Sequence, residues 1–98
     1  MIFELIFTDE AKANLKALEK DPSKKAVLKA VRKTLGLMET NLRYSGLHTH
    51  KYDSLKGPRG EEVFEAYAQN QTPGAYRVFW YYGPAKNQIS IVAIVPHL

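Results

Sequence analysis

Residues 75–98 read AYRVFWYYGPAKNQISIVAIVPHL and predict two adjacent β-strands. In residues 76–82, one set of large side chains alternates with a second set that includes Arg77, and this two-residue period is typical of a strand. The short polar turn at residues 83–88 favours antiparallel pairing with the segment that follows it. Residues 89–95 are nearly all apolar, as expected of a central strand, and Pro96 ends that strand just before a histidine.

The part of the chain before this stretch predicts two further strands and two helices. Residues 2–7 predict a strand that ends at Thr8, which is a good helix N-cap. Apolar residues then recur at helical spacing, and Asp21 with Pro22 predicts the start of a second helix. Residues 62–68, EVFEAYA, predict a strand. The order β-α-α-β-β-β indicates an α+β fold in which a helical hairpin packs on one face of a mainly antiparallel sheet.

The composition is that of one small globular domain, residues 1–98, with a net charge of +4. A chain of this length buries about 60–70% of its unfolded surface. It contains no cysteine, which excludes disulfides and thiolate metal sites. No apolar run approaches the roughly 20 residues of a membrane span, and MIFELIF predicts a strand rather than a signal peptide. We therefore expect a cytoplasmic protein without a membrane partner.

Residues 42–60 form a concentrated basic stretch whose three glycines and one proline predict a long loop. The segment has one acidic residue, Asp53, and Tyr44 and Tyr52 lie among its basic residues. Its cationic and imidazole side chains are Arg43, His48, His50, Lys51, Lys56 and Arg59. Such a mixture suits single-stranded RNA, although a solvated basic loop has the same composition. The two histidines alone define no metal site, so we expect no metal and no cofactor.

Strand alternation also predicts which side chains lie on the sheet face away from the helices. The helices should cover the more uniformly apolar set, which includes Phe64 and Trp80. The opposite face then carries Glu65, Tyr67, Arg77, Phe79 and Tyr81. Charged and aromatic groups on one open face predict a functional site, and an ion pair between Glu65 and Arg77 is compatible with it.

These features together resemble the RelE/ParE toxin superfamily of bacterial toxin–antitoxin systems. YRVF at residues 76–79 corresponds to that family's tyrosine/histidine–arginine–hydrophobic strand, and VFEAY at residues 63–67 resembles the strand before it. The final ISIVAIVPH and the order of elements extend the resemblance over nearly the whole chain. The resemblance implies a RelE-like toxin domain that either cleaves mRNA or acts on DNA gyrase.

The nuclease branch of this family uses an arginine on the penultimate strand and often a histidine or tyrosine after the last strand. Arg77 and His97 match these two positions. Basic residues before the second strand also match, namely Lys51, Lys56 and Arg59. Two positions depart from the pattern: Tyr67 stands where many members have arginine, and Leu98 stands where some nucleases have tyrosine.

The matched residues support metal-independent RNA cleavage in which the 2′-hydroxyl attacks the adjacent phosphate. His97 is the candidate general acid for the leaving 5′-oxygen, and Arg77 is the candidate ligand of the phosphoryl oxygens. The general base is Glu65 or Lys51, and the residues leave this choice open. The candidate RNA-binding residues are Lys56, Arg59, Arg43, His50, Tyr67 and Tyr81.

The resemblance therefore implies the toxin of a type II toxin–antitoxin system that cleaves mRNA in the ribosomal A site. Its second implied partner is a cognate antitoxin, which we expect to be locally acidic. Two alternatives keep the same fold. One is a ParE-like gyrase toxin without nuclease activity, and the other is a catalytically silent member that binds RNA or an antitoxin.

Overall fold

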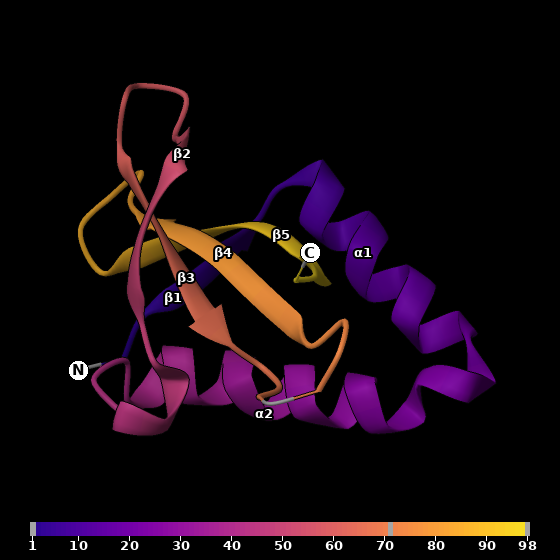
Figure 1. The fold of residues 1–98 in the computed structure, drawn as a ribbon. Coiled ribbons are helices and arrows are strands. Elements are labelled where there is room, and N and C mark those ends of the chain that lie inside the picture. Colours follow the sequence, from indigo (N-terminus) through magenta and orange to yellow (C-terminus); the bar gives the residue numbers. More distant parts are fainter. Residues whose placement is uncertain (1, 71, 98) are drawn as a thin grey trace.

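The computed structural model describes residues 2–70 and 72–97, which form two helices on a five-stranded sheet (Figure 1). The helices are α1 (Asp9–Lys20) and α2 (Lys25–Thr40), and the short 3-10 helices are η1 (Pro22–Lys24) and η2 (Ser45–Leu47). The strands are β1 (Glu4–Phe7), β2 (His50–Lys56), β3 (Glu62–Tyr67), β4 (Tyr76–Tyr82) and β5 (Gln88–Pro96). The sheet order is β1-β5-β4-β3-β2, in which β1 runs parallel to β5 and the remaining neighbours are antiparallel. The predicted α+β class is confirmed.

Thr8 determines where α1 begins and how it meets the sheet. Its Oγ1 accepts a hydrogen bond from the backbone N–H of Ala11 at 3.1 Å and donates one to the carbonyl of Val92 on β5 at 2.9 Å. Asp9 and Glu10 occupy the first turn, where negative charge interacts favourably with the helix dipole. The predicted N-cap thus also connects the helix to β5.

Asp21 separates the two helices, as the sequence predicts. Its Oδ1 accepts hydrogen bonds from the Ser23 hydroxyl at 2.7 Å and from the Ser23 backbone N–H at 2.9 Å. These bonds, the one from the hydroxyl most of all, lower the pKa of the Asp21 carboxyl because they stabilise its charged form. Pro22 follows at the start of η1, which leads directly into α2.

The main core lies between the helices and one face of the sheet. Its buried members are Ala11, Leu18, Val31, Leu35, Met38, Leu47, Ala66, Val78, Trp80, Ile89, Ile91 and Ile94. Trp80 is 1% exposed and stacks on Phe64 with ring centroids 4.9 Å apart. Full burial of each large side chain contributes about 1.5–3 kcal/mol. The alternation in β3 and β4 predicts this face correctly.

A second, smaller core occupies the opposite face of the sheet. It contains the buried residues Val63, Phe79, Tyr81 and Ala93. Tyr52 of β2 packs edge-on against Phe79, with ring centroids 4.7 Å apart. The face that the sequence predicts to be open is therefore partly covered by β2.

The expectation that residues 42–60 form a loop is wrong for residues 50–56, which form β2. Apart from the half-buried Tyr52, every residue of this strand is exposed. The segment therefore lacks the apolar alternation by which a strand is detected in sequence. Backbone pairing with β3 makes it a strand, and the pairing shifts register between Lys51 and Lys56.

Candidate functional site

Glu65 lies at the centre of a cluster of ionisable side chains that come from β2, β3, β4 and the residue after β5. Its Oε1 is 2.8 Å from His50 Nε2. Its Oε2 is 3.6 Å from Arg77 Nε and 3.5 Å from His97 Nδ1. The sheet register explains this convergence, because Glu65 pairs with His50 on one side and with Phe79 on the other. Arg77 lies two residues from Phe79 and therefore on the same face.

The cluster has a buried interior and an exposed edge. The side chains of Glu65 and Arg77 are 4% and 8% exposed, whereas those of His50 and His97 are 46% and 53% exposed. A buried carboxylate is tolerated only with cationic or hydrogen-bonding partners. Among the described residues, Oε1 has a hydrogen bond with His50, whereas Oε2 has no hydrogen bond and lies at ion-pair distance from Arg77 and His97. The arrangement therefore presents two imidazoles to solvent, each beside the same buried acid.

The guanidinium of Arg77 contacts two backbone carbonyls and one aromatic ring. Its Nη1 donates hydrogen bonds to the carbonyls of Gln69 at 2.5 Å and Tyr76 at 3.4 Å. Its guanidinium carbon lies 3.6 Å from the ring centroid of Tyr67, its cross-strand neighbour. The predicted role of Arg77 as a phosphate ligand requires exposed N–H groups, and the side chain offers little such surface. Its Nε faces Glu65 Oε2 instead of solvent.

The backbone of His97 is anchored just past the end of β5 by a hydrogen bond to the residue before β4. Its backbone N–H donates to the carbonyl of Ala75 at 2.7 Å, which continues the pairing of β5 with β4 past Pro96. Its Nδ1 faces Glu65, and among the described residues no hydrogen bond engages its Nε2. This leaves one ring nitrogen available for proton transfer. Leu98, the other terminal residue of interest, lies outside the described residues.

His50 has both ring nitrogens engaged. Nδ1 lies 2.8 Å from the carbonyl oxygen of His48, and Nε2 lies 2.8 Å from Glu65 Oε1. His48 adopts a left-handed conformation, φ 48°, which the chain uses as it enters β2. A backbone carbonyl only accepts hydrogen bonds, so Nδ1 is the nitrogen that donates to His48, and Nε2 is the nitrogen that faces Glu65.

The remaining sequence candidates lie apart from Glu65. Lys51 pairs with Phe64, and its Nζ is 3.7 Å from Glu62 on the exposed side of the hairpin. Tyr81 is 8% exposed and belongs to the second core, so it offers little surface for stacking. Lys56 and Arg59 are exposed where β2 turns into β3. The structure therefore gives Lys51 no contact with the predicted catalytic residues.

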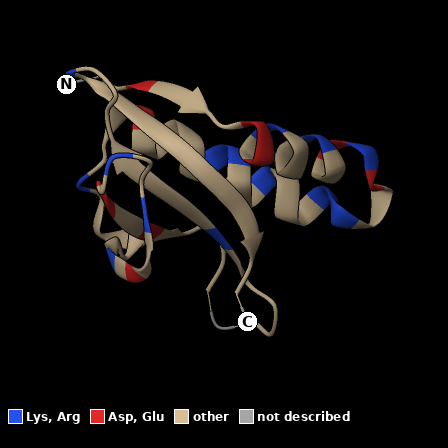
Figure 2. Cartoon of the chain, turned by 90° about the horizontal axis from the view of Figure 1, so that it is seen from above, with Lys and Arg blue, Asp and Glu red and all other residues tan. Residues whose placement is uncertain are grey.

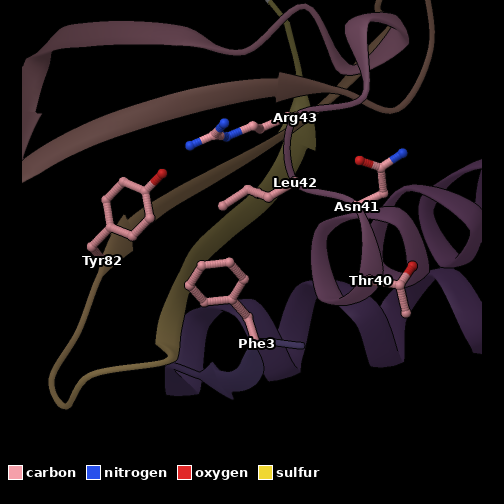
Figure 3. A pocket seen from close by; sticks show the side chains of 6 residues that line it. All are labelled: Phe3, Thr40, Asn41, Leu42, Arg43 and Tyr82. Atoms are coloured by element: carbon pink, nitrogen blue, oxygen red, sulfur yellow. The ribbon is translucent and has the colours of Figure 1, made fainter. Parts of the chain in front are cut away.

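Arg43 lines a different cavity, of about 350 Å³, at the end of α2 (Figure 3). The cavity is lined by Phe3, Thr40, Asn41, Leu42, Arg43 and Tyr82. Figure 3 shows the guanidinium of Arg43 extending toward the hydroxyl end of Tyr82. None of the residues around Glu65 lines this cavity, so Arg43 and the Glu65 cluster belong to separate sites.

Charged residues are common on the helices and rare in β4 and β5, the strands next to the Glu65 cluster. Figure 2 shows Lys and Arg spread over both helices. In β4 and β5, by contrast, Arg77 is the single charged residue. Within residues 2–70 and 72–97, no group of three His, Cys, Asp or Glu side chains is arranged so that it could hold a metal ion. Over the same residues, no helix is both long enough and apolar enough to span a membrane.

Sequence reasoning treats His50 as an RNA contact and misses its pairing with Glu65. The signal is the histidine-rich entry to residues 50–56 opposite a strand that carries an acid. The sequence does not predict β2 as a strand, and the partner of His50 depends on the register between β2 and β3. The signal therefore cannot be used from the sequence alone.

Comparisons with known proteins identify the fold. No protein-family model matches the sequence, and no curated protein matches it. Among solved structures, a chain of the archaeal RelE–RelB complex from Pyrococcus horikoshii OT3 aligns with 18% identity and a TM-score of 0.64, covering 98% of this chain and 96% of that one. The YoeB/ParE toxin from Agrobacterium tumefaciens aligns with 7% identity and a TM-score of 0.69, covering 98% and 100%. A chain of the E. coli DinJ–YafQ toxin–antitoxin complex aligns with 10% identity and a TM-score of 0.66, covering 99% and 94%.

These alignments span whole chains at low identity, so they establish the fold. The protein shares its fold with these toxin structures, and the resemblance inferred from residues 63–67 and 76–79 is confirmed as a resemblance of fold.

Proposed function

We propose that this protein is the toxin of a type II toxin–antitoxin system and cleaves mRNA as a metal-independent endoribonuclease. One observation carries the proposal: the buried carboxylate of Glu65 contacts two half-exposed imidazoles, His50 at 2.8 Å and His97 at 3.5 Å. A pair of exposed imidazoles beside one acid is suited to moving protons at neutral pH. A toxin that only binds gyrase has no use for such a cluster.

The proposed reaction needs no group beyond the RNA and the side chains. The 2′-oxygen loses its proton to a base and forms a bond to phosphorus, while the bond from phosphorus to the 5′-oxygen breaks. The 5′-oxygen takes a proton from an acid, which leaves a 2′,3′-cyclic phosphate and a 5′-hydroxyl. His97 is the acid, because its Nε2 is unengaged and its Nδ1 faces Glu65.

His50 is the proposed base in place of the two candidates that the sequence left open. Glu65 is 4% exposed and cannot reach a bound ribose, and the nearest charged group to Lys51 is Glu62. His50 is exposed, and it acts as the base in its neutral form, in which Nδ1–H donates to the His48 carbonyl and the lone pair of Nε2 turns from Glu65 to the 2′-hydroxyl. Glu65 and Arg77 are positioning residues that hold the two rings.

Phosphate binding falls to exposed cations on the same hairpin as His50. Lys56 and Arg59 lie on the β2–β3 hairpin, which projects from the sheet (Figure 1). We propose that they hold the mRNA backbone while the ribosomal A site presents the strand, which locates the protein in the cytoplasm. The proposed antitoxin partner is supported by the matched structures described as a RelE–RelB complex and as a DinJ–YafQ toxin–antitoxin complex.

The test is expression of the protein without a partner, with pulse labelling of protein and DNA synthesis and mapping of mRNA ends. We expect protein synthesis to stop first and new 5′-hydroxyl ends to accumulate. His97→Gln should abolish the new ends, whereas Glu39→Gln on α2 should preserve them. Arrest of DNA synthesis with intact mRNA would replace the nuclease with a gyrase toxin.

A further inference from the structure

A narrow slot of about 280 Å³ opens directly beside His97. Buried Phe79 and Ala93 lie at its floor, and Tyr52 and Leu55 of β2 form one side. Its volume falls at the lower end of the roughly 300–1,000 Å³ of small-molecule pockets, so it suits a single planar ring system. Because His97 lines it, an occupant of the slot lies next to the proposed proton donor.

Polar groups line the slot at positions away from its apolar floor. Glu10, in the first turn of α1, and Ser54, on β2, both line it, and both residues are exposed. Within the described residues, no ion pair or side-chain hydrogen bond engages Glu10. An apolar slot with one carboxylate repels phosphates and acidic peptides, and it favours a flat ligand that carries N–H donors on one edge.

We propose that this slot binds a base of the RNA substrate and that Glu10 selects guanine. The inference rests on the proposed nuclease function of the same site. Guanine presents two adjacent N–H donors, N1–H and N2–H, which match the two oxygens of a carboxylate. Adenine and cytosine each place a ring acceptor beside their amino group, and uracil places its N–H between two carbonyls. Each of these three bases would bring an oxygen or nitrogen lone pair against Glu10.

The aromatic side chains account for the rest of the binding. Bases that leave a stacked strand are commonly held on aromatic side chains. Tyr52 and Phe79 are both slot residues, and their rings pack against each other 4.7 Å apart. Tyr52, which is half-buried, thus offers the stacking surface for any base, buried Phe79 supports its ring, and Glu10 supplies the preference among bases.

Titration with nucleotides tests the slot without requiring cleavage. The full chain is titrated with 3′-GMP, 3′-AMP, 3′-CMP and 3′-UMP, and the NMR signals of Tyr52 and Ala93 are followed. We expect 3′-GMP to bind about 10-fold more tightly than the others, the value of one good bidentate contact. Glu10→Gln should abolish this preference. Asp9→Asn is the matched control, because it removes a charge from the same helical turn and Asp9 does not line the slot.

A second measurement separates the slot from the proposed function. Wild type and Glu10→Gln are incubated with ribosomes that carry guanine or adenine at each A-site position. The proposal expects a guanine preference of about 10-fold at one position, which disappears in the variant. If nothing is cleaved but 3′-GMP binds selectively through Glu10, the slot stands and the nuclease proposal fails. The proposal would be overturned by equal binding of the four nucleotides, by no binding, or by cleavage whose base preference is unchanged in Glu10→Gln. The slot would then be assigned to an apolar side chain of a protein partner.

Discussion

Replacing Glu65 with glutamine should destabilise the protein by an amount set by its buried partner. Arg77 is 8% exposed and would lose the one carboxylate that touches it. Removing one member of a buried ion pair costs about 3–5 kcal/mol, because the other charge remains buried. Arg77 keeps its bond to the Gln69 carbonyl and its stacking on Tyr67, so the lower value of about 3 kcal/mol applies. For a domain of this size, the melting temperature should fall by about 12–24 °C.

Urea unfolding followed by the fluorescence of Trp80 measures this change. Trp80 is the single tryptophan and is 1% exposed, so its emission reports the main core. Glu62→Gln on the same strand is the matched control, because its 3.7 Å pair with Lys51 is exposed and is worth less than about 1 kcal/mol. The double variant Glu65→Leu/Arg77→Met should recover to within about 1 kcal/mol of wild type, since no charge stays buried. Equal stability of Glu65→Gln and Glu62→Gln would refute the buried network.

Three further predictions concern activity, RNA binding and helix capping. His97→Gln should slow single-turnover cleavage on programmed ribosomes by about 100-fold or more while leaving urea stability unchanged, and a variant that cuts at the wild-type rate would remove His97 from the reaction. Replacing Lys56 and Arg59 with alanine should reduce the slope of log affinity for RNA against log salt by about 0.7 for each phosphate that is no longer neutralised, and an unchanged slope would make them ordinary surface charges. Thr8→Ala should cost about 1–2 kcal/mol in urea unfolding, because the hydroxyl both caps α1 and bonds to Val92, whereas a cost near zero would mean that water replaces it.

The sequence is sufficient for the elements whose local signals agree with the fold. Thr8 and Asp21 predict the helix boundaries because their side chains bond to backbone N–H groups within three residues. Alternation predicts the two faces of β3 and β4, because one face is covered by helices and a one-residue slip would expose that whole set. Phe64 and Trp80 accordingly lie toward the helices.

The sequence is insufficient where structure depends on a distant partner. β2 carries one half-buried side chain, Tyr52, and becomes a strand through its pairing with β3. Without β2, nothing in the sequence predicts that Glu65 is buried or that His50 lies against it. The enclosure of Arg77 escapes sequence reasoning for the same reason, because an exposed face is expected where the guanidinium is in fact covered.

The Glu65–Arg77 pair is better explained by the site than by stability. Apolar replacement of both residues should leave the fold nearly as stable, so packing alone does not require a charged pair inside the second core. The pair orients the carboxylate of Glu65. Arg77 on β4 contacts this carboxylate, which then faces His50 on β2 and His97 after β5. Glu65 thereby brings together imidazoles from two strands that are not neighbours in the sheet. Removal of Glu65 should consequently impair cleavage even in the double variant that restores folding.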